Sequence, residues 1–114
     1  MPQVFGNVSA FSHMEGMMNI GACMVRLRLP ENESLKGKRQ ISKSIIERVK
    51  SRYNVSVAEV DDQDLWQLVT LGITCVSTSA QHANEVLSKV VDFIQKSRFD
   101  VEMLDYEVEI IHAF

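Results

Sequence analysis

Residues 54–77, NVSVAEVDDQDLWQLVTLGITCVS, decide the fold because they hold two strand patterns separated by a short polar break. The run 55–60 is rich in valine. In the run 65–77, apolar residues alternate with small or polar ones, which is typical of a strand with one buried face. The break between them, 61–64, is acidic and short, so the two strands are predicted to form an antiparallel hairpin.

An amphipathic helix is predicted on each side of this hairpin. Upstream, Ser34 is a suitable N-cap for a helix that runs to about Tyr53. At 100° per residue its apolar side chains fall on one arc, which holds Leu35, Ile41, Ile45, Ile46, Val49 and Tyr53. Downstream, 78–81 fit a capping box for a helix at about 80–97.

A strand pattern lies outside each helix. Residues 19–29, NIGACMVRLRL, alternate with a period of two until Pro30 ends the strand, and residues 101–111 alternate in the same way. The order β-α-β-β-α-β with right-handed crossovers predicts a four-stranded antiparallel sheet of spatial order 4-1-3-2 with both helices on one face. This is an α+β, ferredoxin-like sandwich. We expect one such domain at 19–114, preceded by a loosely ordered extension at 1–18.

Strand parity assigns each side chain to the covered or the open face of this sheet. The row predicted to face the helices contains Cys23, Val25, Leu27, Val69, Leu71, Ile73, Leu104, Tyr106 and Val108. On the open face, Arg26 and Arg28 are expected to pair with Glu107 and Glu109 of the neighbouring strand. The two central strands present no aromatic residue there, so we do not expect the base stacking of RNA-recognition motifs.

Charge is distributed unevenly along the 114 residues, although the net charge is only −3. Residues 26–53 hold nine Lys/Arg and three Asp/Glu, whereas residues 54–114 hold three Lys/Arg and eleven Asp/Glu. The hydrophobic content of 46% is that of a folded globular protein. Composition therefore excludes a disordered or uniformly basic protein and leaves room for one basic surface.

Three strings resemble the YlxP-like proteins, small bacterial proteins of unassigned function. They are VRLRLPENESLKGKR, NVSVAEVDDQDLWQLVTLGITCVS and LDYEVEI, and the resemblance spans about 19–111. It implies a ferredoxin-like fold and supplies no activity. Genes of this family are often found beside genes for translation initiation and ribosome maturation, which implies a ribosome- or RNA-linked role. The extension at 1–18 departs from the family pattern.

The first candidate site is the start of the first helix. Lys and Arg side chains lie there at the helix N-terminus, where the partial positive charge of the helix dipole favours anions. Gly37 is a poor helix former at the same place, and local rules broken together often mark a functional site. We expect an anion- or RNA-binding stripe about 20 Å long. On the helical wheel the stripe contains Lys36, Arg39, Lys43 and Lys50. At the first turn, Lys36, Lys38 and Arg39 together with free backbone amides are expected to bind a phosphate or another anion. The alternative is a solvated face neutralised by Glu31, Glu33 and Glu47.

The second candidate is the hairpin, where Asp61, Asp62, Asp64 and Trp66 could form a loop that docks a partner. A structural turn with Trp66 packed over its base is the alternative, because aspartate side chains bond local backbone amides. A divalent cation is a third reading, although the spacing fits no EF-hand loop. The open sheet face is the third candidate, for a homodimer or a small ligand.

No residue pattern predicts catalysis, a cofactor or a metal site. Cys23 and Cys75 belong to no CxxC pair and are expected as reduced core thiols, with a disulfide between them left open. The sequence thus predicts a non-enzymatic cytoplasmic accessory protein that contacts RNA or a ribosomal particle through its first helix, without a membrane anchor. The alternative is a homo-oligomeric or small-ligand-binding protein that uses the open face or the acidic hairpin.

Overall fold

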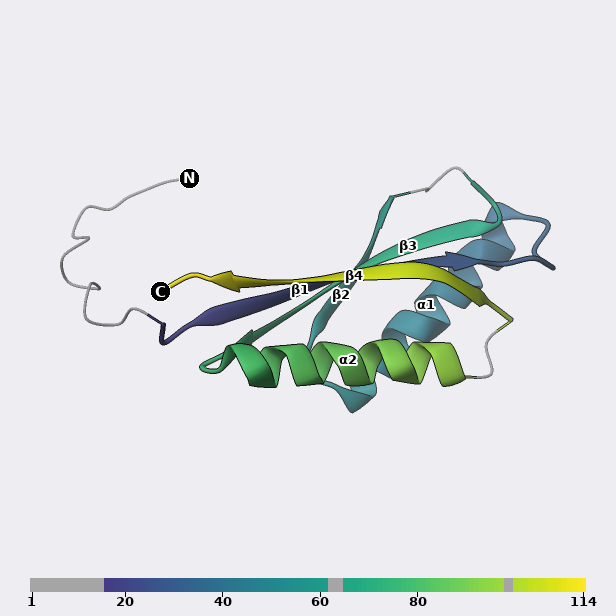
Figure 1. The fold of residues 1–114 in the computed structure, drawn as a ribbon. Helices are drawn as coiled ribbons and strands as arrows, with labels where there is room; N and C mark the ends of the chain where they lie inside the picture. The colour runs from purple at the N-terminus through teal and green to yellow at the C-terminus, as the bar shows by residue number, and fades with distance from the viewer. Residues whose placement is uncertain (1–15, 62–64, 98–99) are drawn as a thin grey trace.

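The computed structural model describes residues 16–61, 65–97 and 100–114. Its elements follow the predicted order and are β1 (Asn19–Arg28), α1 (Leu35–Arg52), β2 (Ser56–Asp61), β3 (Leu68–Ser77), α2 (Ala80–Lys96) and β4 (Glu102–His112). All strand pairs are antiparallel and the sheet order is β2-β3-β1-β4, which confirms the predicted ferredoxin-like topology (Figure 1).

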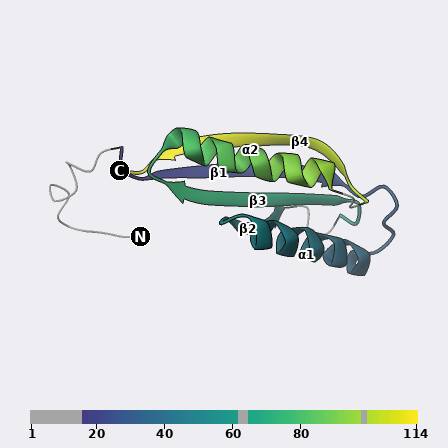
Figure 2. The same cartoon turned by 90° about the horizontal axis from the view of Figure 1, so that it is seen from below.

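Both helices lie on one face of the sheet, as Figure 2 shows from below. Their apolar stripes meet the inward rows of the strands, so the core lies between the two layers. Its fully buried members include Val25, Leu27, Ile45, Leu71 and Leu87. Tyr53, the C-cap of α1, contacts Phe93 of α2 edge to face, with ring centroids 5.9 Å apart.

Two predicted boundaries were wrong because local hydrogen bonds end the elements elsewhere. The third strand was expected from residue 65, but β3 begins at Leu68, since the carbonyl groups of residues 65–67 all accept hydrogen bonds from the loop after β1 or from α1. The N-cap of α2 is Ser79, whose hydroxyl accepts from the His82 amide, and not the Thr78 of the predicted capping box.

A β-bulge in β4 changes the predicted partners of the open-face arginines. The register of β4 against β1 shifts between Arg26 and Leu27, which leaves Leu104 as the extra residue. Arg26 therefore pairs with Asp105 and Arg28 with Glu102, each at 3.0 Å, and not with Glu107 and Glu109. Met103 replaces Leu104 in the row that packs on the core, and Leu104 is 45% exposed.

Most of the predicted extension at 1–18 lies outside the described residues. Its last residue, Met18, exchanges backbone hydrogen bonds with Ala113 and Phe114, so it belongs to the β1–β4 end of the sheet. Among the described residues, neither helix is long and apolar enough to cross a membrane.

Cys23 and Cys75 are buried and unpaired by a disulfide, as expected for reduced core thiols. Burial raises the pKa of the Cys23 thiol from 9.0 to about 11 and also raises that of Cys75. Because the thiolate is the reactive form, a shift of this size lowers its fraction at pH 8 roughly a hundredfold. We expect iodoacetamide to alkylate Cys23 at least that much more slowly in native protein than in urea. Mass spectrometry of the labelled peptides measures both rates, and equal rates would contradict a buried thiol.

Candidate polyanion-binding helix

Helix α1 begins at the Ser34 N-cap, whose hydroxyl accepts a hydrogen bond of 2.9 Å from the Gly37 amide. Four of the five predicted basic residues point to solvent from this helix and form no ion pair with any residue that the structure describes. We call them the basic stripe; they are Lys36, Arg39, Lys43 and Lys50. The alternative, in which Glu31, Glu33 and Glu47 neutralise the stripe, finds no such pair among the described ion pairs.

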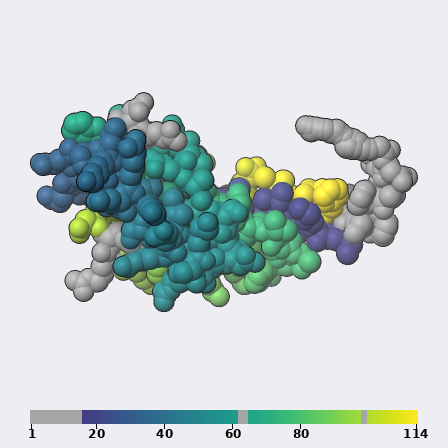
Figure 3. All heavy atoms as spheres, turned by 180° about the vertical axis from the view of Figure 1, so that it is seen from behind, coloured from purple at the N-terminus to yellow at the C-terminus, as the bar shows by residue number. Residues whose placement is uncertain are grey.

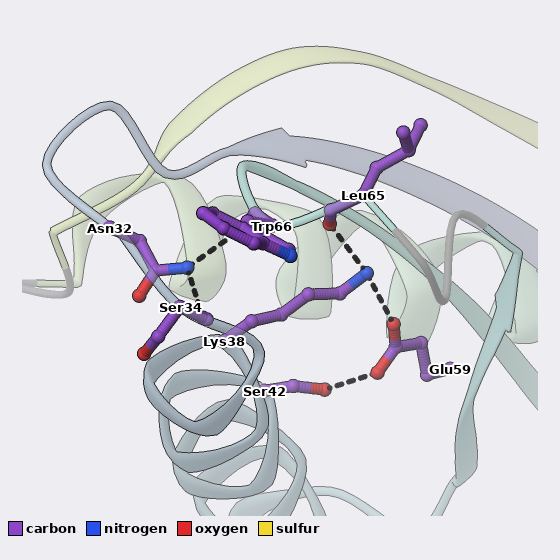
Figure 4. Close-up of polar contacts among 7 residues, drawn as sticks. All are labelled: Asn32, Ser34, Lys38, Ser42, Glu59, Leu65 and Trp66. Atoms are coloured by element: carbon purple, nitrogen blue, oxygen red, sulfur yellow. Dashed lines mark hydrogen bonds and ion pairs between the residues drawn. The ribbon is translucent and has the colours of Figure 1, made fainter.

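Lys38 was wrongly placed among the anion-binding residues. It is 1% exposed, and its ammonium lies 3.2 Å from Oε2 of Glu59 and donates a hydrogen bond of 2.8 Å to the Leu65 carbonyl (Figure 4). The other carboxylate oxygen of Glu59 accepts from the Ser42 hydroxyl at 3.2 Å. Oε2 of Glu59 is buried and has no hydrogen-bond partner other than this ion pair. Lys38 thus neutralises an internal carboxylate and is unavailable to an external anion.

The angular position of Lys38 on the helical wheel separates it from the basic stripe. At 100° per residue, Lys38 falls in the middle of the apolar arc, almost in line with Ile45, seven residues later. The buried residues of α1 are accordingly Lys38, Ser42, Ile45 and Val49. A matching signal lies in β2, where strand parity places Glu59 on the covered face. An acid and a base on facing buried rows predict an internal pair.

Hydrogen bonds also join the loop after β1 to the residues before β3. The Asn32 amide donates to the carbonyl groups of Ser34 and Trp66, as Figure 4 shows. The Gln67 amide donates to the carbonyl groups of Pro30 and Asn32. Together with Lys38, these contacts fasten the base of the hairpin to the start of α1. Lys38 and the segment 65–67 therefore specify how the start of α1 and the base of the hairpin dock.

The presence of glycine at position 37 is explained by a contact that the sequence did not reveal. A Cβ atom at this position would lie 2.2 Å from Oδ1 of Asn32, so any other residue would displace the Asn32 side chain from its present place. The glycine is therefore explained by close packing at the helix start. Its poor helix propensity is not, by itself, evidence of an anion site.

A double-mutant cycle tests this explanation of Gly37. In an Asn32→Ala background, Gly37→Ala is expected to raise the free energy of unfolding by up to about 1 kcal/mol, the helix propensity gain. In the parent, the same change should gain nothing or destabilise, since it disrupts the two Asn32 hydrogen bonds, each worth about 1 kcal/mol. Urea unfolding measures all four proteins. An equal gain in both backgrounds would show that Asn32 does not constrain Gly37.

The acidic hairpin is only partly within the described residues. Asp62 and Asp64 lie outside them, so the predicted docking loop is not described as a whole. Asp61 ends β2 and is exposed, and Trp66 is 53% exposed. In the part of the chain that the structure describes, no three His, Cys, Asp or Glu side chains are grouped as metal ligands would be.

The open sheet face contains a shallow depression of about 810 Å³. Its floor is made of small residues, among them Ala22, Ala58 and Gly72, and Val60 lies against Gly72. Glu107 and Glu109 line one side. The predicted row is confirmed in most places, although Thr70 is 2% exposed. The lining offers apolar surface and carboxylates, which is no arrangement for an anionic ligand.

Sheet order and helix placement define the class of this protein as an α+β domain of ferredoxin-like fold. The chain belongs to the family described as "Protein of unknown function (DUF503)", whose sequence pattern matches residues 20–108. A relative is the "Uncharacterized protein YlxP" of Bacillus subtilis (strain 168), which is 43% identical over 61 residues. That match covers 54% of this chain and 66% of the relative. The predicted resemblance to YlxP-like proteins is thereby confirmed.

Two solved structures are similar at low sequence identity. The de novo designed protein Foldit4 gives a TM-score of 0.48 at 17% identity, covering 82% of this chain and 94% of that one. The photo-activated state of BlsA gives a TM-score of 0.44 at 16% identity, covering 78% of this chain and 58% of that one.

Proposed function

We propose that this protein is a non-enzymatic accessory protein of the cytoplasm that binds the phosphate backbone of RNA, free or in a ribosomal particle, through the basic stripe of α1. The observation that carries the proposal is the stripe itself. Lys36, Arg39, Lys43 and Lys50 are exposed and, among the described residues, form no ion pair. Charges without an internal partner are those that an external polyanion can neutralise.

The geometry of the stripe suits a chain of phosphates better than a single anion. Lys36 and Lys50 are fourteen residues apart, which is about 20 Å along a helix. All four side chains fall within about 60° of the helix circumference at 100° per residue, so they project from one side. Residues of α1 form much of the surface seen in Figure 3, so a long ligand can reach this side.

The proposed contact recognises the phosphate charges of the RNA backbone and not the identity of its bases. The described open-face residues of β1 and β3 include no aromatic ring on which a base could stack. Binding through Lys and Arg alone is sequence-independent and depends steeply on salt. RNA is proposed as the polyanion because the genes of YlxP-like proteins often neighbour those of translation initiation and ribosome maturation.

The test is the affinity for a labelled single-stranded RNA in 50 mM salt. For single-stranded RNA, the slope of log affinity against log salt concentration is about −0.7 for each neutralised phosphate. Each phosphate contact therefore makes the affinity in 50 mM salt about eightfold higher than in 1 M salt. Lys36→Ala/Lys43→Ala is therefore expected to weaken binding about 60-fold. The matched control is Lys89→Ala/Lys96→Ala, which removes two exposed cations from α2, and its affinity should stay within about threefold of the parent.

Two outcomes would contradict the proposal. One is that the parent protein does not bind RNA in 50 mM salt. The other is that the α1 and α2 variants lose affinity equally, because the attraction would then depend on total charge and not on the stripe.

A further inference from the structure

Strand β4 forms one edge of the sheet (Figure 2). With 11 residues it is the longest of the strands that the structure describes. Its neighbour in the sheet is β1, and no other described strand pairs with its outer side. An edge strand presents unpaired amide and carbonyl groups that can accept a further strand. The bulge at Leu104 interrupts the ladder, so the regular part of this edge runs from Asp105 to His112.

The two sides of this edge differ in chemistry. On the open face, Asp105 is neutralised by Arg26, whereas Glu107 and Glu109 stand opposite Met24 and Ala22. Neither glutamate forms an ion pair with a described residue. Because they are two residues apart, their charges lie about 7 Å from one another along the strand.

The side of β4 that faces the helices is apolar and incompletely covered. Tyr106 stands opposite the buried Val25 but is 53% exposed, and Val108 and Ile110 are only partly buried. A strand added beside β4 would shield these side chains from water. Cross-strand apolar pairs of this kind contribute roughly 0.2–1 kcal/mol each relative to alanine pairs.

A second copy of this chain fits the acidic part of the edge poorly. If two β4 strands paired about Glu107 in one continuous antiparallel sheet, Glu107 would lie opposite its own copy and Asp105 opposite Glu109. Like charges directly opposite one another destabilise a sheet. A segment of opposite charge complements Glu107 and Glu109 and avoids this repulsion.

We propose that the β4 edge from Asp105 to Ile111 binds, by strand addition, an extended polypeptide segment in which cationic residues alternate with apolar ones. Its Lys or Arg side chains pair with Glu107 and Glu109 on the open face. Its apolar side chains cover Tyr106, Val108 and Ile110 on the other face. Backbone hydrogen bonds supply affinity and the alternation supplies specificity. This site is separate from α1 and does not depend on RNA binding.

The probe is a seven-residue peptide, blocked at both ends, with lysine at odd positions and valine at even positions. Its affinity for the full chain is measured by calorimetry, together with two versions that are N-methylated at alternate amides. In an added strand, alternate amides point toward the neighbour and the others point to solvent. One methylated version should bind at least tenfold more weakly than the unmodified peptide, and the other should stay within about threefold of it.

Charge reversal at the edge tests the partner chemistry. Glu107→Lys/Glu109→Lys is expected to weaken binding at least tenfold, and the control Glu47→Lys/Glu85→Lys, with the same change in net charge on exposed helix positions, no more than about threefold. No binding of the unmodified peptide at millimolar concentration would overturn the proposal. Equal binding of both methylated versions, or equal loss in both charge variants, would do the same. A parent protein that dimerises in sedimentation through β4, and loses the dimer in the Glu107→Lys/Glu109→Lys variant, would also overturn it.

Discussion

Replacing Lys38 by methionine is expected to lower the free energy of unfolding by about 3–5 kcal/mol. The substitution keeps most of the side-chain volume but removes the ammonium group. It leaves the Glu59 carboxylate, whose side chain is 19% exposed, with the Ser42 hydroxyl as its remaining polar contact in the network. It also removes the donor to the Leu65 carbonyl. A loss of this size is a large fraction of the stability of a small domain.

Urea unfolding followed by circular dichroism measures the loss, and Lys36→Met is the matched control. Lys36 is exposed, so its substitution should change the free energy of unfolding by no more than about 0.5 kcal/mol. Lys38→Met/Glu59→Leu removes both charges and should recover much of the loss, because no unpaired buried charge remains. Equal effects of Lys38→Met and Lys36→Met would contradict the structural role of Lys38.

Reversing the whole basic stripe is expected to abolish RNA binding. With four contacts worth about eightfold each in 50 mM salt, Lys36→Glu/Arg39→Glu/Lys43→Glu/Lys50→Glu should lower the affinity by three orders of magnitude or more. The side chains are exposed and their ion pairs with described residues are absent, so the fold should survive the change. Circular dichroism and thermal unfolding check this before binding is measured.

A charge-conserving variant separates the charge of the stripe from its shape. Lys36→Arg/Lys43→Arg/Lys50→Arg keeps every positive charge and should bind RNA within about threefold of the parent. Substantial loss in this variant would mean that lysine geometry, and not the phosphate charge, determines the contact. Full RNA binding by the reversed variant would exclude α1 as the binding surface.

The fold could be predicted from the hydrophobic periodicity of each segment and from the residues that cap or end it, because each element carries these signals in its own sequence. The Ser34 cap and the period-two run in β1 are both where the sequence placed them. The β4 bulge could not be predicted, since period two continues through Leu104 in the sequence and only pairing with β1 reveals the extra residue. The arginine partners shifted as a consequence.

The candidate site could be predicted only in part. Lys38 was assigned to an anion site because it lies between other cations at the first turn, whereas its angular position on α1 assigns it to the buried face. Gly37 was interpreted as the mark of a functional site. Its structural reason is the contact with Asn32, which lies in a loop whose conformation no local pattern predicts. Long-range contacts thus divide a basic segment into one structural lysine and four available cations.

The salt dependence of RNA binding tests the central claim most directly. For the parent, a plot of log affinity against log salt concentration should have a slope of about −2.8, which corresponds to four phosphates on a single strand. The slope should fall to about −1.4 in Lys36→Ala/Lys43→Ala and stay near −2.8 in Lys89→Ala/Lys96→Ala. A parent slope near zero, or an unchanged slope in the α1 variant, would contradict the account.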